Sequence, residues 1–263
     1  MDAFMYFLIF CLGLAIGSFL NVCIYRIPAQ KSLIRPGSHC CHCEAPIRPY
    51  DNIPLVSFLI LGGRCRRCRA KISIRYPAVE LMTALLFVAL FRAYGPSLQF
   101  LIYGPLMAAL LVITLIDLNQ YIIPDRITIP GALVGLLCSP LNAQLGSGVK
   151  GVFASLIGFF IGGILFFLIA LLGSAVFKKE SMGGGDIKLA AMLGTFLGWK
   201  GALFSFFLAF FSGALIGAIV LLVSSHRSNT RVPFGPFLAL GAACYVFFGE
   251  LILETYWGYV SGP

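Results

Sequence analysis

The sequence predicts an all-α polytopic membrane protein with about eight transmembrane helices and one small domain outside the membrane, between the first two helices. Hydrophobic residues make up 59% of the 263 positions, charged residues only 11%, and the mean hydropathy is +0.95. Ordinary globular domains are about 25% charged. Helices that cross the hydrocarbon layer need about 20 apolar residues. The candidate spans are residues 4–24, 77–94, 98–117, 127–145, 150–173, 187–199, 201–223 and 234–256.

The first apolar segment also resembles a secretory signal peptide. It continues, however, into the polar residues Asn21 and Arg26 without a small-residue cleavage site. We therefore expect residues 1–25 to form the first transmembrane helix. Residues 26–76 follow as an extramembrane domain, and residues 77–263 form the transmembrane core.

The loop 26–76 carries ten Lys and Arg residues against only two acids, Glu44 and Asp51. An excess of Lys and Arg marks the cytoplasmic side of a membrane protein. With eight spans, this orientation also places the Asp117 end of the third span and the Asp186 end of the sixth span on the cytoplasmic face. The net charge of +9 fits a basic rim that faces anionic lipid, and it needs no nucleic-acid partner to explain it.

Two C-x-x-C pairs lie in this loop, Cys40 with Cys43 and Cys65 with Cys68, separated by 21 residues. That spacing is close to the range for a four-cysteine zinc site. Two disulfides are the competing interpretation, but a cytoplasmic loop is kept reduced, which favours zinc, or alternatively iron. Four thiolates leave no open position on the metal, so the zinc is expected to be structural. Cys41 and His42 could substitute as ligands, although the C-x-x-C register favours Cys40 and Cys43.

Two aspartates interrupt the apolar pattern. Asp117 closes the run that begins at Leu101, and Asp186 follows three glycines, residues 183–185. An ionisable residue at a membrane span is by default a functional candidate. Two converging carboxyl groups cannot both ionise easily, so one can hold a proton while the other accepts one from water, as in aspartic proteolysis.

Other interpretations of the acidic residues remain open from the residues alone. Asp186 precedes a helix and could be a simple N-cap, and Asp125, just after Pro124, fits a cap even better. An ion-coupled transporter also uses intramembrane carboxylates, but no internal repeat is visible and the four cysteines have no place in it. A membrane-anchored zinc scaffold would tolerate loss of both aspartates.

Several motifs, in this order, are shared with one known family. They are Gly17-Ser18-Phe19-Leu20-Asn21-Val22, Arg48 with Asp51-Asn52-Ile53-Pro54-Leu55, Gly63-Arg64-Cys65-Arg66-Arg67-Cys68, Ile72-Ser73 with Arg75-Tyr76-Pro77 and Glu80, Asp117 with Ile123-Pro124-Asp125, the G-x-G-D segment Gly183-Gly184-Gly185-Asp186-Ile187-Lys188, and Pro233-Phe234-Gly235-Pro236. Over nearly its whole length the chain resembles the type IV prepilin peptidases.

The resemblance implies two activities in the bacterial inner membrane. Members cut the basic leader of type IV prepilins, or of type II secretion pseudopilins, at the cytoplasmic face. They then N-methylate the new terminal residue, usually Phe, with S-adenosylmethionine. Carried onto this sequence, the catalytic pair is Asp117 and Asp186, with Asp125 outside the pair, and residues 77–263 are the aspartic protease core.

The residues that carry methylation are not identified by the resemblance. No strand leads into the glycine-rich segment, so a soluble dinucleotide-type fold is not expected. The zinc loop is the expected contributor, with Arg48 and Glu80 as candidates that could equally be surface or packing residues. Two narrower alternatives are a peptidase that has lost methylation and one that serves only secretion pseudopilins.

Overall fold

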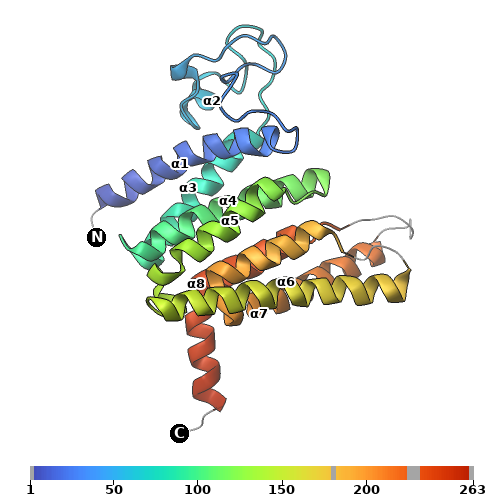
Figure 1. Cartoon of the computed structure of the whole chain (residues 1–263). Helices are drawn as coiled ribbons and strands as arrows, with labels where there is room; N and C mark the ends of the chain where they lie inside the picture. The colour runs from blue at the N-terminus through green and yellow to red at the C-terminus, as the bar shows by residue number, and fades with distance from the viewer. Residues whose placement is uncertain (1–2, 179–181, 224–231, 261–263) are drawn as a thin grey trace. The chain divides into compact units, whose positions relative to one another are not determined.

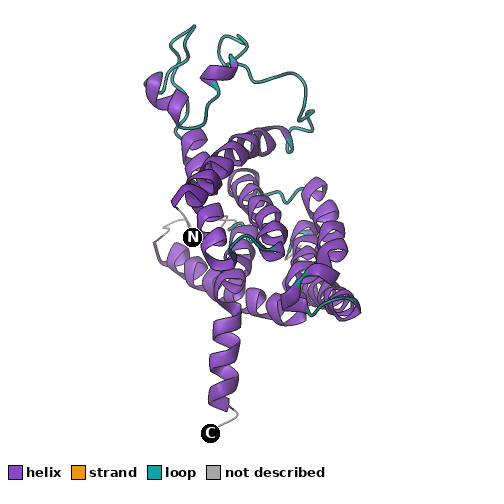
Figure 2. Ribbon diagram, turned by 90° about the vertical axis from the view of Figure 1, so that its left-hand side faces the viewer, coloured by secondary structure: helices purple, strands orange, loops and turns teal. Residues whose placement is uncertain are grey.

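The computed structural model describes residues 3–178, 182–223 and 232–260 of the chain. In these ranges all regular elements are helices, as Figure 2 shows, and β-pairing is limited to two isolated bridges, His39 with Pro46 and Arg64 with Lys71. The prediction of an all-helical chain is confirmed for this part of the sequence.

The helices follow one another along the chain as labelled in Figure 1. They are α1 (Ala3–Arg26), η1 (Pro49–Asp51), α2 (Val56–Ile60), α3 (Arg75–Tyr94), α4 (Leu98–Gln120), α5 (Asp125–Cys138), η2 (Ser139–Leu141), η3 (Ala143–Leu145), α6 (Val149–Phe177), α7 (Gly184–Val223) and α8 (Gly235–Val260), where η denotes a 3-10 helix.

Among the described residues, five helices are long and apolar enough to cross a membrane. These are Ala3–Arg26, Arg75–Tyr94, Leu98–Gln120, Val149–Val176 and Gly184–Val220, and a shorter apolar stretch covers Gly235–Gly249. The chain is therefore a multi-pass membrane protein. Eight separate spans were expected, three more than this count. One of the three is the segment 234–256, which falls on α8, where the described apolar stretch is Gly235–Gly249. Two further features of the structure account for the other two.

The first feature is the segment 127–145, which is helical only to Cys138 and then forms two 3-10 turns. Pro140 lies just past the helix end, where it has no backbone N–H to extend the hydrogen-bond ladder. The second feature is α7, which counts as one candidate span although it contains two helical parts, as the segments 187–199 and 201–223 predict, with a break at Gly198, where φ is 65°. A glycine adopts this φ without steric cost.

Two compact units divide the chain, Met1–Pro96 and Ser97–Pro263. In the first unit, α1 packs against α3 through small residues of α1. A β-carbon on Gly13 would lie 2.6 Å from Ala84 Cα, and one on Gly17 would lie 2.7 Å from Glu80 Cα. Such residues let helix backbones approach closely in a membrane. As the α1 residue number rises the α3 partner number falls, so the two helices are antiparallel.

In the second unit, α7 packs against α5, α6 and α8, and α8 also contacts α4. The contact of α6 with α7 is backbone to backbone, since a β-carbon on Gly194 would lie 2.0 Å from the Gly158 carbonyl oxygen. Phe166 of α6 is fully buried, and its ring centroid lies 4.6 Å from that of Phe206 of α7. This packing fixes the start of α7, where Asp186 lies, relative to the ends of its neighbours.

Candidate functional site

Asp117 lies near the C-terminal end of α4, where Tyr121 adopts a left-handed conformation and ends the helix. The Asp117 side chain is only 5% exposed, and its Oδ2 accepts the backbone N–H of Gly235 at 2.9 Å. Gly235 begins α8, so a helix N-terminus points at this carboxyl group. Free N–H groups at a helix N-terminus favour negative charge, which suits an ionised Asp117.

Asp186 is the third residue of α7 and is partly buried. Its backbone N–H donates to the Gly183 carbonyl at 3.1 Å, which closes a turn over the glycines before it. The carboxyl groups of Asp186 and Asp117 are close enough to interact electrostatically. The structure thus brings together two acids that are 69 positions apart in the sequence.

Ile123 lies against the starts of both α7 and α8, beside the two acids. A β-carbon on Gly185 would lie 2.8 Å from Ile123 Cβ, and one on Gly235 would lie 3.3 Å from Ile123 Cδ1 and 2.7 Å from Asp117 Oδ2. A side chain at either position would therefore force a neighbour to move, because distances below 3.0 Å are closer than β-carbons normally come to other atoms. The close neighbour of Gly185, one residue before Asp186, is the segment before α5.

Gly235 and Ile123 are site residues to which the sequence reasoning gave no role. Both lie in motifs that were visible, the Pro-Phe-Gly-Pro segment and Ile123-Pro124-Asp125. Neither residue has a polar or ionisable side chain, so its residue type did not mark it as a functional candidate. Gly235 contributes its backbone N–H to the site, and Ile123 contributes an apolar side chain that fits against the two glycines.

Asp125 is placed differently from the pair. It is exposed at the first turn of α5, one residue after the N-cap Pro124, and its Oδ2 forms an ion pair with Lys188 Nζ at 2.6 Å. This arrangement ties the start of α5 to the start of α7, two residues beyond Asp186.

The four cysteines of the two C-x-x-C pairs converge in the first unit. The sulfur atoms of Cys40, Cys43, Cys65 and Cys68 all lie within 4.8 Å of one another, and those of Cys40 and Cys68 are 3.8 Å apart. Tetrahedral zinc with bonds of about 2.3 Å requires sulfur atoms about 3.8 Å apart. The donor set and its spacing therefore fit a four-thiolate metal, without Cys41 or His42.

The two C-x-x-C turns repeat the same hydrogen bonds. The Cys40 N–H donates to the Ala45 carbonyl at 2.9 Å, and the Cys65 N–H donates to the Ala70 carbonyl at the same distance. Each turn also carries a residue with positive φ just after its second cysteine. The loop is therefore built from two copies of one local structure, which face each other across the sulfur atoms.

Backbone N–H groups within each turn point at the first sulfur atom. Those of Cys43 and His42 donate to Cys40 and lower the pKa of its thiol from 9.0 to about 6. In the second turn the N–H groups of Cys68 and Arg67 lower the pKa of the Cys65 thiol in the same way. Thiolates rather than thiols bind metals, so the local backbone favours the ligand form of the first cysteine of each pair, Cys40 and Cys65.

Arg66 connects the second turn to the rest of the loop. Its guanidinium makes a bidentate contact with Asp51, with Nη2 2.7 Å from Oδ1, and lies over the Tyr50 ring. These hydrogen bonds hold the pKa of the Asp51 carboxyl below its usual range. Arg48, a methylation candidate, is exposed and donates to the Tyr50 hydroxyl. Arg48 therefore contacts another residue of the same loop.

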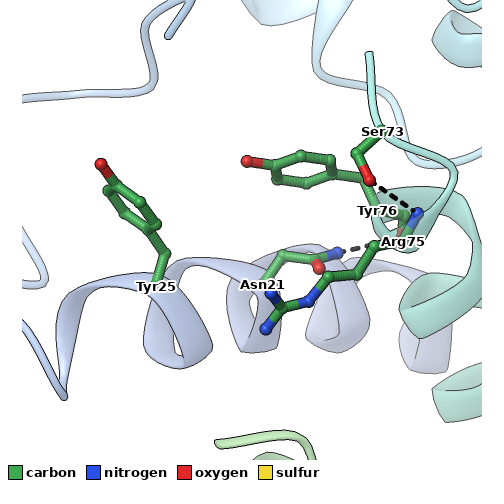
Figure 3. Close-up of a pocket in the computed structure, with 5 residues that line it drawn as sticks. All are labelled: Asn21, Tyr25, Ser73, Arg75 and Tyr76. Atoms are coloured by element: carbon green, nitrogen blue, oxygen red, sulfur yellow. Dashed lines mark hydrogen bonds between the residues drawn. The ribbon is translucent and has the colours of Figure 1, made fainter. Parts of the chain in front are cut away.

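A small pocket of about 130 Å³ opens in the first unit where α3 begins (Figure 3). It is lined by Asn21 and Tyr25 of α1 and by Ser73, Arg75 and Tyr76. The Asn21 amide donates to the Tyr76 carbonyl at 3.0 Å, which fixes the floor of the pocket. Figure 3 shows the Tyr25 and Tyr76 rings on the same side of α1, with the Arg75 guanidinium beside Asn21.

Comparison with known proteins gives two family matches that together cover most of the chain. Residues 11–94 match the bacterial peptidase A24 N-terminal domain, and residues 105–218 match the type IV leader peptidase family. The first match lies within the unit that holds the cysteines, and the second includes both Asp117 and Asp186. No solved structure matches the chain significantly.

Three similar proteins are each named prepilin leader peptidase/N-methyltransferase. The one from Myxococcus xanthus (strain DK1622) is 41% identical over 85% of this chain, which spans 65% of that protein's length. The one from Aeromonas hydrophila is 37% identical, covering 95% of this chain and 92% of its own. The one from Legionella pneumophila is 32% identical, covering 97% and 96%.

Proposed function

Because the chain belongs to the type IV leader peptidase family, we propose that it cleaves the leader from prepilins and then N-methylates the new amino terminus. Asp117 and Asp186 are the catalytic pair for cleavage. The observation that carries this proposal is their meeting at the ends of two helices that the sequence places far apart, with one of them buried against the N-terminus of α8.

The pair shares one proton. The Gly235 N–H favours negative charge on Asp117 Oδ2, so we assign the ionised form to Asp117 and the proton to Asp186. Asp117 takes a proton from a water molecule, which attacks the scissile carbonyl carbon. Asp186 first donates to the carbonyl oxygen, and the leaving amine then receives a proton from the pair. Such proton transfers contribute about 100- to 10,000-fold to the rate of a reaction.

The substrate is a prepilin or a type II secretion pseudopilin with a basic leader. Its apolar segment lies among the membrane spans, and its leader stays at the cytoplasmic face of the bacterial inner membrane. The excess of Lys and Arg in the loop 26–76 supports this orientation. The eight-span arrangement, with α5 and the two halves of α7 as separate crossings, belongs to the same proposal. No nucleic acid takes part.

Residues 26–76 form a zinc-binding domain, and residues 77–263 form the aspartic protease core. The metal is structural, because Cys40, Cys43, Cys65 and Cys68 complete a tetrahedron and leave no position for water. A loop with so few buried apolar side chains gains most of its stability from the metal.

S-adenosylmethionine is the co-substrate for the second activity, and it supplies an electrophilic methyl group. This chain must bring the new amine to that group and remove a proton from it. The pocket at Asn21, Tyr25 and Arg75 supports binding of the carboxylate end of such a donor, because a guanidinium complements a carboxylate.

The test is cleavage of a prepilin by the purified protein in detergent, with labelled S-adenosylmethionine present. We expect Asp117→Asn and Asp186→Asn each to lower cleavage by at least about 100-fold while the helices stay folded by circular dichroism. Methyl label should appear on the product of the wild type. Substantial cleavage by either variant would refute the catalytic pair.

A further inference from the structure

Glu80 is a buried carboxyl group that the cleavage mechanism does not use. It lies on α3 in the first unit and is 8% exposed. Its Oε2 accepts the Leu55 backbone N–H at 2.9 Å, and the Ser18 hydroxyl also contacts it. Neither ion pair found in the described residues includes Glu80. A buried carboxylate without a cation is costly and marks a functional candidate.

Leu55 holds an unusual backbone conformation to make this contact. Its φ is 58° and its ψ is −49°, a combination that a leucine rarely adopts. Observed strain of this kind persists where the surrounding structure requires it, often at functional sites. Here the strained residue directs its N–H at Glu80 and leaves the second carboxyl oxygen without a backbone donor among the hydrogen bonds of the described residues.

The pocket at the start of α3 lies one helical turn from Glu80 along the contact of α1 with α3. Gly17 packs against Glu80, and one turn further along α1 the Asn21 amide bonds the Tyr76 carbonyl at the pocket floor. A helical turn advances about 5.4 Å. The pocket (Figure 3) and Glu80 therefore lie on neighbouring turns of the same helix pair, with the Asn21–Tyr76 hydrogen bond between them.

The chemistry required of the first unit points to the same residue. The leader peptidase match falls on residues 105–218, whereas the similar proteins are named for N-methylation as well. Peptide cleavage produces an α-amine, which is largely an ammonium ion near neutral pH. An ammonium ion must lose a proton before its lone pair can accept a methyl group. A desolvated carboxylate attracts the ammonium ion and accepts that proton.

We propose that Glu80 binds the substrate's new α-amine and takes its proton for methyl transfer, with the methyl donor in the adjoining pocket. The amine nitrogen then attacks the donor's methyl carbon. The carbon–sulfur bond breaks, its electron pair stays on sulfur, and a neutral thioether and a secondary ammonium ion result. Glu80 finally releases the proton to water. This inference rests on the proposed function, because it needs an N-methylation step.

The direct test uses the wild-type protein and a carbodiimide that enters apolar sites, dicyclohexylcarbodiimide. This reagent activates a carboxyl group, which then forms an amide with an amine in contact with it. We expect a peptide with the mature, free amino terminus to couple to Glu80, as mapped by mass spectrometry, and the N-acetylated peptide not to. Coupling confined to other carboxyl groups, or none at Glu80, overturns the proposal.

A second test separates this inference from the proposed function. Glu80→Gln can still accept the Leu55 N–H through its amide oxygen, and continued prepilin cleavage reports that the variant is folded. We expect its methylation rate to fall at least about 100-fold, while Glu44→Gln, an exposed acid of the same unit, methylates like the wild type. Normal methylation by Glu80→Gln overturns the inference and leaves the proposed function intact. No methylation by the wild type overturns the proposed function itself.

Discussion

The cysteine cluster and the aspartate pair are assembled in different ways. The cluster takes its sulfur atoms from two short turns, residues 40–45 and 65–70, that repeat the same backbone hydrogen bonds. The aspartate site instead joins the end of α4, the segment before α5 and the starts of α7 and α8. The geometry of the cysteine cluster, which is made of local turns, is set mainly by the metal-binding residues themselves. The geometry of the aspartate site, which is dispersed over several helices, is set equally by the uncharged residues around the two acids.

The largest expected effect comes from removing a metal ligand. Cys40→Ser and Cys65→Ser should each lose the metal at neutral pH, because structural zinc contributes roughly 10–16 kcal/mol in small zinc domains. The loop should then be cut by added protease while the helical content stays the same. Metal analysis by atomic emission and limited proteolysis measure both effects.

Cys41→Ser is the matched control, because Cys41 is exposed and lies outside the cluster. It should retain the metal at the wild-type level. If the wild-type protein carries no metal under reducing conditions, the four cysteines are not a metal site. The cysteine cluster then cannot be described as a metal site built from local turns, in contrast to the dispersed aspartate site.

A methyl group added at Gly235 tests the dispersed site. The new β-carbon of Gly235→Ala would lie 2.7 Å from Asp117 Oδ2, so the carboxyl group or the start of α8 must shift. We expect cleavage to fall on the order of 100-fold, the size of effect that a displacement of about 1 Å can have. Initial rates at saturating substrate measure the change.

Gly217→Ala serves as the control in the same unit. A β-carbon on Gly217 would meet no atom within 4 Å, so the substitution should leave cleavage unchanged. Equal activity of the Gly235 and Gly217 variants would show that the contact of Gly235 with Asp117 plays no part in catalysis.

A smaller effect is expected at Asp125. Its ion pair with Lys188 is exposed, and such pairs contribute about 0–1 kcal/mol. Asp125→Asn should therefore cleave within about fivefold of the wild-type rate, as should Lys188→Gln. An inactive Asp125→Asn beside an active Asp117→Asn would move the catalytic role to Asp125.

The smallest effect concerns the pH dependence of the loop. The hydrogen bonds from Arg66 lower the pKa of Asp51, so this contact stabilises the folded loop fully above pH 3.8. The stabilisation is lost as the pH falls through the lowered pKa of the folded state. Asp51→Asn should remove this loss of loop stability at acid pH and leave the stability of the loop near neutral pH unchanged. The rate of proteolysis of the metal-loaded protein as a function of pH measures both.

The positions of the helices were predicted better than their lengths. Each predicted apolar segment lies in a helix or continues from one, yet among the described residues five helices are both long and apolar enough to span a membrane, and α5 ends at Cys138. Hydropathy reports that a segment is apolar, but a proline or glycine decides where the helix stops. Gly198 has a non-helical conformation inside α7, so the two predicted spans 187–199 and 201–223 correspond to the two helical parts on either side of this break.

The sequence by itself determined the membrane character, the four cysteines and the two aspartates, because composition and residue type carry those signals. Only the tertiary structure decided that Gly235 donates to Asp117, that Ile123 fills the space between Gly185 and Gly235, and that Asp125 pairs with Lys188. These contacts join segments distant in the chain through backbone atoms and shape. Such contacts cannot be read from the types of the residues involved, because they depend on how distant helices pack against one another.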